Sequence, residues 1–439
     1  MRYKTTGWLA LLLALVALPT LAEKNFYEIY LIFKNADYWK QASAKEISEL
    51  AEELPGGLQY RLPGMKYTLL HPAAGYGKSS LVHFLLKEGL DPNAIDINER
   101  TPLHWAAERN PDPEVVRLLV KSGAIINARS FRGVTPLHLA LAKNTSSKVA
   151  RTLLSLGAYL DLKDEYGTDA LGYAAEGSRD LKLIQELVKQ KGFSIKRADN
   201  RGWLPIHHAA SSNSYLPTHQ LLVKLGADPT QNIAGSLMTP LHLAAASNPN
   251  PDVVLWYIEQ GNSIDAQVGD GSQPIHLAAL NPNPEVLRAL VHRGANPRAR
   301  NHMGNQPIHQ AALEANAATV QALLDLGVDP NTKDDMGYTP LFYAALADYP
   351  EPEVARALIE AGAKVDVFNN SGFTPLLYIA RFGDSSSAEE FALALLELGA
   401  DPMVKNRFGM SALDMLMQNP SLREGELREA LEKTIHGNP

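Results

Sequence analysis

The stretch from His71 to Leu86, HPAAGYGKSSLVHFLL, contains a Gly-Lys-Ser pattern of the kind that ends many phosphate-binding loops. Such a loop carries another glycine five positions earlier, so that backbone N–H groups can point at phosphate oxygens. Pro72 stands at that place and has no N–H to donate. The stretch therefore predicts no nucleotide site, and its glycines need another explanation.

Histidine is the next residue type that could carry chemistry, as a metal ligand or a general base. Seven of the 13 histidines occupy one short phrase that returns along the chain. Packed helices lie about 8–10 Å apart, and metal ligands lie about 2 Å from the ion, so histidines one repeat apart cannot share a metal. The sequence contains no His-Glu-x-x-His and no Gly-x-Ser-x-Gly motif. We therefore expect no catalytic residue, no metal site and no cofactor. The seven histidines are His71, His104, His138, His207, His242, His276 and His309.

Several carboxylates follow a proline at the start of an expected helix, where a negative charge offsets the helix dipole. Helix initiation accounts for these residues without catalysis. The Pro-x-Pro turns that contain or precede them leave a second interpretation open, which is a ridge that contacts a partner. The carboxylates are Glu114, Asp252, Glu285 and Glu353, and the turns span 110–113, 248–251, 281–284 and 350–352.

Composition places the chain among folded proteins. Of 439 residues, 45% are hydrophobic and 20% are charged, and the net charge is −7 without any basic block. We expect no nucleic-acid partner, because that affinity depends on clustered lysine and arginine. Cysteine is absent, which excludes disulfides and thiol nucleophiles.

The first 22 residues have the pattern of a secretory signal peptide. Arg2 and Lys4 precede an apolar run over 8–18, and Thr20 and Ala22 stand where signal peptidase reads small residues. The run is shorter than the ~20 residues that span a bilayer. We expect cleavage after Ala22, export, and no stable membrane insertion after the signal is removed. Because exported eukaryotic domains usually carry disulfides, a bacterial periplasmic location is favoured, with an extracellular location as the alternative.

The elements that hold these residues repeat every 33 to 37 positions. Each copy has a phrase such as Thr-Pro-Leu-His, a helical run, and Gly-Ala or a variant of it. This resembles the ankyrin repeat over residues 65–437, and we count eleven copies. The phrases begin at Thr68, Thr101, Thr135, Leu204, Thr239, Gln273, Gln306, Thr339 and Thr374, with weaker copies at Asp169 and Ser411.

The repeat has a physical basis in its helix signals. Threonine suits an N-cap and proline suits the first helical position, where no N–H is needed. Alanine pairs such as Ala106-Ala107 let neighbouring helices approach closely, and a glycine such as Gly133 permits the positive φ of a tight turn. The resemblance implies an all-α fold with short β-hairpin fingers, in which the phrase histidines hydrogen-bond within and between repeats. Residues 23–64, with a capping box at Ser43 and Glu46, are expected to form a helical N-terminal cap, and the last helix of 65–437 a C-terminal cap.

The resemblance also implies a binding surface, because finger tips and the exposed ends of first helices grip partners in this family. Aromatic residues, methionine and arginine at these places are the types enriched at interfaces. We expected Arg201 and Trp203 to be exposed and to be a major part of this surface. The predicted protein-binding residues are Phe131, Arg132, Tyr166, Arg201, Trp203, His302, Met303, Met336, Tyr338, Phe373, Arg381, Phe382, Arg407 and Phe408, with Arg109 and Lys143 as further helix positions.

These features predict a non-enzymatic, monomeric scaffold that binds a protein partner in the bacterial periplasm, as an inhibitor of an enzyme or as an immunity protein does. A secreted effector that binds host proteins is the alternative from the same class. An enzyme is the opposing class, but the region before Thr68 is too short for a separate catalytic domain. The identity of the partner is left open.

Overall fold

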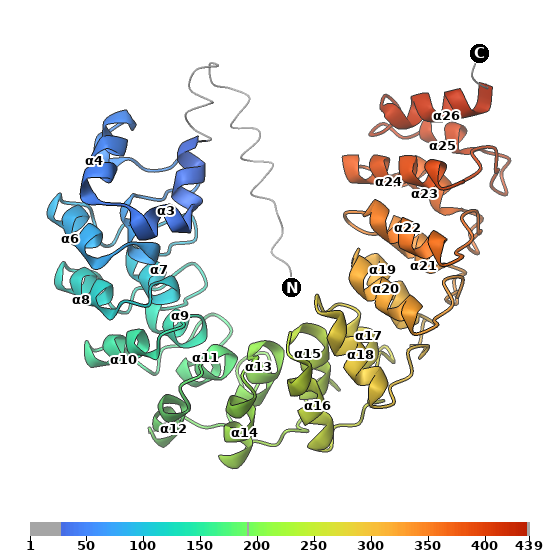
Figure 1. Ribbon diagram of the computed structural model, residues 1–439. Coiled ribbons are helices and arrows are strands. Elements are labelled where there is room, and N and C mark those ends of the chain that lie inside the picture. The colour runs from blue at the N-terminus through green and yellow to red at the C-terminus, as the bar shows by residue number, and fades with distance from the viewer. Residues whose placement is uncertain (1–27, 191–192, 437–439) are drawn as a thin grey trace. The chain divides into compact units, whose positions relative to one another are not determined.

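The computed structural model describes residues 28–190 and 193–436, and the chain forms two compact units. Unit 1 contains the residues up to 208 together with 220–225, and unit 2 contains 209–219 together with the residues from 226 onward. Within each unit, consecutive helix pairs lie side by side in chain order (Figure 1). The boundary between the units passes through α13 (Pro205–Ser212) and α14 (Leu216–Lys224).

Unit 1 is helical from its first described residues. Residues 28–34 are helical and are followed by two helices and a 3₁₀ turn before the first repeat. Its elements are α3 (Ala36–Gln41), α4 (Ala44–Glu53), η1 (Gly57–Gln59), α5 (Leu70–Tyr76), α6 (Ser79–Lys87), α7 (Pro102–Arg109), α8 (Pro113–Lys121), α9 (Pro136–Ala142), α10 (Ser147–Ser155), α11 (Ala170–Gly177) and α12 (Leu181–Lys189).

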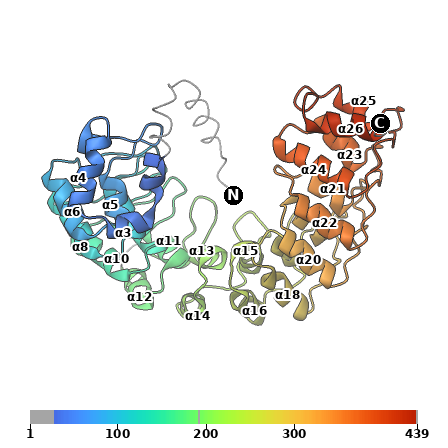
Figure 2. The ribbon, with the colours of Figure 1, turned by 45° about the horizontal axis from the view of Figure 1, so that its top comes forward.

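Unit 2 repeats the same pairing to the end of the described chain (Figure 2). Its helices are α15 (Pro240–Ser247), α16 (Pro251–Glu259), α17 (Pro274–Ala278), α18 (Pro284–His292), α19 (Pro307–Leu313), α20 (Ala317–Asp325), α21 (Pro340–Ala345), α22 (Pro352–Glu360), α23 (Pro375–Phe382), α24 (Ser386–Glu397), α25 (Ala412–Leu416) and α26 (Glu426–His436). From α5/α6 to α25/α26 the described residues contain eleven helix pairs, which confirms the predicted all-α repeat fold.

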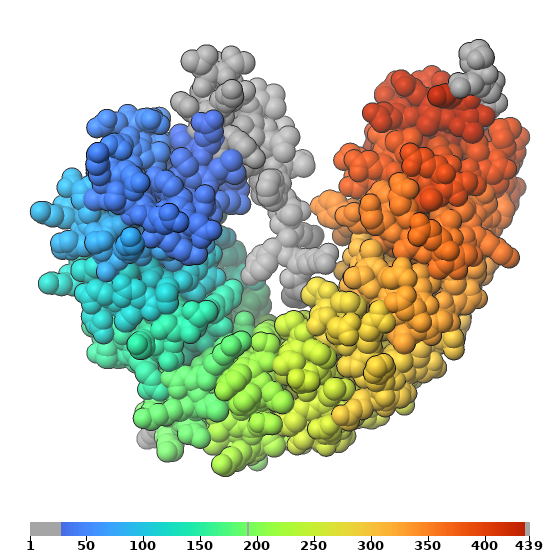
Figure 3. All heavy atoms as spheres, viewed as in Figure 1, coloured from blue at the N-terminus to red at the C-terminus, as the bar shows by residue number. Residues whose placement is uncertain are grey.

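The helices begin where the sequence predicts. The Thr239 hydroxyl accepts the His242 N–H at 3.4 Å, and Pro240 takes the first helical position. Behind each first helix, a second helix such as α8 buries Val115, Val116 and Leu119 on one face. The alanine pairs are fully buried, so neighbouring helices pack closely. Atoms of adjacent repeats are in tight contact in the space-filling view (Figure 3).

The fingers are tighter than the β-hairpins that we predicted. In the finger at 164–168, the Asp164 N–H donates to the Thr168 carbonyl at 3.1 Å, and Gly167 adopts φ 78° to close the turn. A ladder of one such bond is too short to form a strand, and the described residues contain only the isolated bridge between Arg61 and Thr68. Adjacent fingers are joined instead, since the Glu165 N–H donates to the Arg132 carbonyl at 2.9 Å.

In several repeats a buried or half-buried asparagine side chain joins the inter-helix loop to the loop of the preceding repeat. The Asn281 amide donates to the Ala245 carbonyl at 3.0 Å and the Asn248 carbonyl at 2.8 Å, and its oxygen accepts the Asn283 N–H at 2.9 Å. We call this row the asparagine ladder. Three of its members belong to the Pro-x-Pro turns, where the sequence analysis saw only helix initiation or a ridge. Its members are Asn110, Asn144, Asn248, Asn281, Asn316 and Asn419.

The ends of the chain agree in part with the sequence analysis. The capping box before α4 is confirmed, because the Ser43 N–H donates to Glu46 at 2.7 Å and the Glu46 N–H donates to the Ser43 hydroxyl at 3.3 Å. The helix α26 buries Leu427 and Leu431 completely. The predicted signal peptide at 1–22 lies outside the described residues, and the bounds 23–64 and 65–437 stay predictions. Within the described chain, none of the helices has the length and apolar character needed to cross a bilayer.

Candidate functional site

The Gly-Lys-Ser stretch forms an ordinary helix-to-helix connection. Gly77 is the C-cap of α5, and its N–H donates to the Ala73 carbonyl at 2.8 Å. Lys78 is the N-cap of α6, and a helix rather than a strand leads into it. The backbone N–H of Gly77 is therefore already committed, and the geometry is not that of a phosphate-binding loop.

The phrase histidines are buried, and six of them, His71, His104, His138, His242, His276 and His309, form hydrogen bonds at both ring nitrogens. In α7, the Thr101 N–H donates to His104 Nδ1 at 3.1 Å, and His104 Nε2 faces the Val134 carbonyl of the next repeat at 3.0 Å. Burial lowers the pKa of His104 to about 4, against the effect of the hydrogen bond to Val134. Neutral rings in this arrangement donate from Nε2 and have no lone pair left for a metal. The predicted bonding within and between repeats is confirmed for these six histidines, and for His207 the bond within its repeat is confirmed by the Leu204 N–H, which donates to Nδ1 at 2.9 Å.

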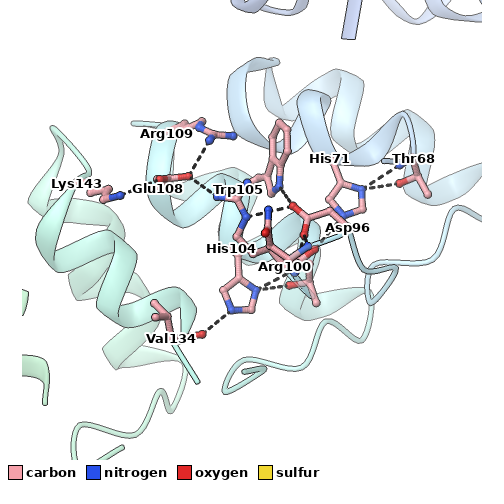
Figure 4. Close-up of polar contacts among 12 residues, drawn as sticks. Thr68, His71, Asp96, Arg100, His104, Trp105, Glu108, Arg109, Val134 and Lys143 are labelled. Atoms are coloured by element: carbon pink, nitrogen blue, oxygen red, sulfur yellow. Dashed lines mark hydrogen bonds and ion pairs between the residues drawn. The ribbon is translucent and has the colours of Figure 1, made fainter. Parts of the chain in front are cut away.

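Figure 4 shows the polar contacts that surround the first complete finger. The Asp96 carboxylate is fully buried and accepts hydrogen bonds from Arg100 Nε at 3.1 Å and Trp105 Nε1 at 3.0 Å. The backbone N–H groups of Asn98 and Arg100 donate to the same carboxylate at 2.8 and 2.9 Å. Asp96 thus fixes the finger to the first helix of its repeat.

The Glu108 carboxylate forms ion pairs with Arg109 and Lys143, the two further helix positions named in the sequence analysis. Its carboxylate contacts Arg109 at 3.0 Å, Arg100 at 3.2 Å and Lys143 at 3.5 Å (Figure 4). The Arg109 guanidinium also lies 4.3 Å from the centre of the Trp105 ring. Arg109 and Lys143 are therefore parts of a preformed charged cluster that spans two repeats.

Four predicted residues of unit 1 come together in a stack along three neighbouring fingers. The Arg201 guanidinium lies 4.7 Å from the centre of the Tyr166 ring and 4.9 Å from the centre of the Trp203 ring. The Arg132 guanidinium lies 5.9 Å from the centre of the same Tyr166 ring. Arg132 Nε also lies 3.4 Å from the Glu165 carboxylate. We call Arg132, Tyr166, Arg201 and Trp203 the finger stack.

The finger stack rests on a buried carboxylate that the sequence analysis missed. Asp199 accepts from Arg201 Nη2 at 2.9 Å and Thr168 Oγ1 at 3.0 Å, and it lies 3.3 Å from His208 Nε2. Burial acts to raise its pKa, but the hydrogen bonds from these groups and from backbone N–H groups hold the pKa well below its usual range. Asp199 is the first residue of its finger, and Asp96 and Asp164 stand at the same position in their fingers. This recurrence is the sequence signal that could have identified the buried carboxylate.

The expected exposure is confirmed for Arg201 but is wrong for Trp203. Trp203 is half-buried, and its ring meets the His208 ring edge-on with centroids 5.2 Å apart. The Arg201 side chain is 40% exposed, but its charge is paired with Asp199, which is 3% exposed. Both residues therefore contribute to packing as well as to the surface.

Four predicted residues of unit 2 form a second cluster. Tyr338, Phe373 and Phe382 belong to a continuous series of ring contacts with Phe342 and Tyr378, with centroid distances between 4.6 and 6.4 Å. The Arg381 guanidinium lies 5.3 Å from the centre of the Phe382 ring. We call the five rings the aromatic row. The sequence analysis missed Phe342, which takes the place of the phrase histidine, and Tyr378.

The other predicted residues lie on further fingers and are exposed. Phe131 and Phe408 are 69% and 67% exposed, and Met303 and Met336 are 55% and 52% exposed. Their neighbours His302 and Arg407 are exposed too. The Asp335 N–H donates to the Met303 carbonyl at 3.1 Å, so the two methionines lie on directly joined fingers.

Comparison with known proteins agrees with this geometry. The family model described as "Ankyrin repeats (3 copies)" matches residues 70–164, 142–233, 241–334 and 308–406, which together exceed half of the chain. The human protein "Ankyrin repeat and SOCS box protein 3" is 36% identical over 106 residues, 23% of this chain and 19% of that protein. The chain thus matches about a fifth of that relative's length.

Among solved structures, the ankyrin repeat domain of Bcl-3, described as a unique member of the IkappaB protein family, is 28% identical. The likeness covers 53% of this chain and 99% of that chain, with a TM-score of 0.41.

Proposed function

Because the chain belongs to the ankyrin-repeat family, we propose that it is a non-enzymatic, monomeric scaffold that binds a protein partner in the bacterial periplasm. Within that role, we propose that it restrains or protects against an enzyme, as an inhibitor or an immunity protein does. The basic start and apolar run of residues 2–18 support export. The repeated helix pairs support protein binding, which is the general role of ankyrin repeats.

The finger stack is the observation that carries the proposal. Two arginines and two aromatic rings are held in one row by a buried aspartate and by backbone bonds between fingers. Rigid side chains of these types lose little conformational entropy on binding, and they are the residue types that dominate interface energies. A surface of this kind favours one well-defined partner.

The partner is to be captured from an envelope extract with the mature chain as bait, and the captured enzyme is then assayed with and without the chain. An inhibitor lowers its activity in proportion to the chain added, up to one equivalent. A captured protein whose activity the chain leaves unchanged contradicts the inhibitor role. Size-exclusion chromatography with light scattering tests the monomer.

The surface is tested with Arg132→Ala/Tyr166→Ala, which avoids the packed residues Arg201 and Trp203. We expect partner binding to weaken by about 2 kcal/mol, with the melting temperature nearly unchanged. The matched control is Lys148→Ala/Tyr159→Ala, which removes an exposed cation and a 61% exposed tyrosine away from the fingers. Equal affinities of the two double variants would place recognition on another surface.

Export is tested by the intact mass of the exported chain. We expect a mature chain that begins at Glu23, released by osmotic shock. A chain that retains Met1 contradicts the signal, and accumulation in the culture medium contradicts the periplasmic location.

A further inference from the structure

A second kind of side-chain bond joins consecutive repeats in the stretch that leads from a second helix to the next finger. The Asn331 oxygen accepts the Lys364 N–H at 2.8 Å, and its amide donates to the Gly362 carbonyl at 2.9 Å. Asn93 forms the same two bonds with the repeat that follows it, at 2.8 and 2.9 Å. An asparagine at this place therefore supplies one acceptor and one donor to the following repeat.

Asp366 takes the place of this asparagine before the finger at 369–373. Its Oδ2 accepts the Asp401 N–H at 3.0 Å, as the Asn331 oxygen accepts the N–H of Lys364. Its Oδ1 is buried and has no hydrogen-bond partner among the described residues. An ionised carboxylate can only accept hydrogen bonds, so it cannot make the bond that an asparagine donates to the carbonyl of the next repeat. At this interface the corresponding carbonyl is that of Gly399.

Two other links are missing between the same two repeats, α23/α24 and α25/α26. Elsewhere in unit 2 backbone bonds join adjacent fingers, as the Asn370 N–H joins the Met336 carbonyl at 3.0 Å. Among the described residues no bond of this kind joins Arg407 to Ser371. Leu377 stands at the place of the phrase histidine, and it has no ring nitrogen with which to bond the next repeat. On the finger side, the polar contact between these repeats therefore depends largely on the carboxyl group.

The inter-helix loops on the other side of these two repeats are joined without a titratable group. The Asn419 amide donates to the Ala380 carbonyl at 3.2 Å and to the Gly383 carbonyl at 2.8 Å. The two repeats are thus held by an amide on one side and by a carboxyl on the other. This arrangement makes the finger side the one that responds to pH.

We propose that Asp366 is a pH-sensitive joint between the repeats α23/α24 and α25/α26, which is firm while its carboxyl carries a proton and loosens when the proton is lost. The protonated oxygen is a donor, as the amide of Asn331 is, and the Gly399 carbonyl is its acceptor. Asp366 Oδ2 continues to accept the Asp401 N–H in both states.

The surroundings of the carboxyl favour its protonated form. Burial raises the pKa of Asp366, and the nearby charge of Asp401 also raises it, against the effect of the bond from the Asp401 N–H. Two lysines lie near in the chain, but Lys364 is exposed and Lys333 Nζ donates to the Phe368 carbonyl at 3.2 Å. Because the pKa is higher in the folded chain than the ordinary value of 3.8, the contribution to stability is fully present below pH 3.8. It is lost as the pH rises through the folded value.

The joint acts on part of the predicted binding surface. The two fingers that meet here carry Phe373 and Phe408, which are both predicted protein-binding residues. A loosened joint holds these fingers less firmly relative to each other. The effect is opposite in direction to that of the buried phrase histidines, of which the last along the chain is His309.

The test is hydrogen–deuterium exchange of the full mature chain, read by mass spectrometry on peptides that cover 399–410. Exchange is measured at pH 4.5 and pH 7.5 and corrected for the intrinsic rate at each pH. We expect the parent chain to be protected at least about fivefold more at pH 4.5. Asp366→Asn supplies the donor at every pH, so at pH 7.5 it should exchange at least about fivefold more slowly than the parent and lose the pH dependence.

The matched control is Asp265→Asn, which makes the same change at the same place of another repeat of unit 2, where the side chain is exposed. We expect the exchange of the peptides over 299–305 and over 399–410 to change by less than about twofold. Equal protection of the parent at both pH values would overturn the proposal. An Asp366→Asn chain that exchanges like the parent at pH 7.5 would overturn it as well.

Discussion

Buried phrase histidines such as His104 and His138 contribute a pH-dependent part of the stability. Burial lowers the pKa of His104 and of His138 to about 4, whereas the ordinary value is 6.5. The unfolded chain therefore takes up a proton below pH 6.5, but the folded chain does not until about pH 4. The contribution is fully present above pH 6.5 and is lost as the pH falls toward 4.

Unfolding by urea at several pH values measures this effect. A pKa change of this size corresponds to about 3 kcal/mol for one histidine. We expect the free energy of unfolding to fall steeply between pH 6.5 and pH 4.5, and His104→Gln to reduce that slope. A flat profile in this range would contradict buried neutral histidines.

A single histidine also bridges two repeats. His242→Ala leaves the Thr239 N–H and the Ala266 carbonyl without the bonds of 3.2 and 3.0 Å that they form now. We expect a loss of about 1–3 kcal/mol in urea unfolding. The control is His83→Ala, at an exposed position of α6, which should change stability by less than about 0.5 kcal/mol. Stoichiometric transition metal in the purified protein would contradict the purely structural role.

At the scale of the element, the first helices were predictable because each begins with a local signal. Threonine and proline before Leu241 specify where α15 starts, whatever surrounds it. The length of the fingers was not predictable in this way, because a strand requires a ladder of bonds to a neighbour. Likewise Trp203 is half-buried because His208, five residues on, folds back against it.

The asparagine ladder is the element-scale feature that most needs a mutational test. Asn281→Ala removes two bonds to the preceding loop and one to its own, and Asn281 is completely buried. We expect a loss of about 2–3 kcal/mol. Asn98→Ala, at an exposed finger position, is the control and should be nearly neutral. A neutral Asn281→Ala would mean that water replaces the amide.

At the scale of the whole molecule, the copy number followed directly from the recurring phrase. The sites followed less well, because a phrase marks what is alike in all repeats, whereas the finger stack and the aromatic row arise from residues that differ between repeats. Phe342 replaces a phrase histidine, and its ring contact with Tyr378 depends on a residue of the next repeat. The division into two units has no counterpart in the phrase.

A repeat such as the one with Asn281 donates hydrogen bonds to the preceding repeat and accepts equivalent bonds from the following repeat. If one whole repeat is removed, the two repeats on either side can therefore form the same kind of interface with each other. Removing the 33 residues 273–305 joins Ser272 to Gln306 and brings Asn316 opposite the Asn248 carbonyl in place of that of Asn281. We expect this shortened chain to unfold cooperatively, with helical circular dichroism reduced by one repeat. Removing only the 22 residues 284–305 leaves α17 without its partner helix, and that chain should aggregate or melt early. Similar behaviour of both deletions would contradict the modularity, whereas the expected contrast would show how such a protein changes its reach through loss or duplication of whole repeats.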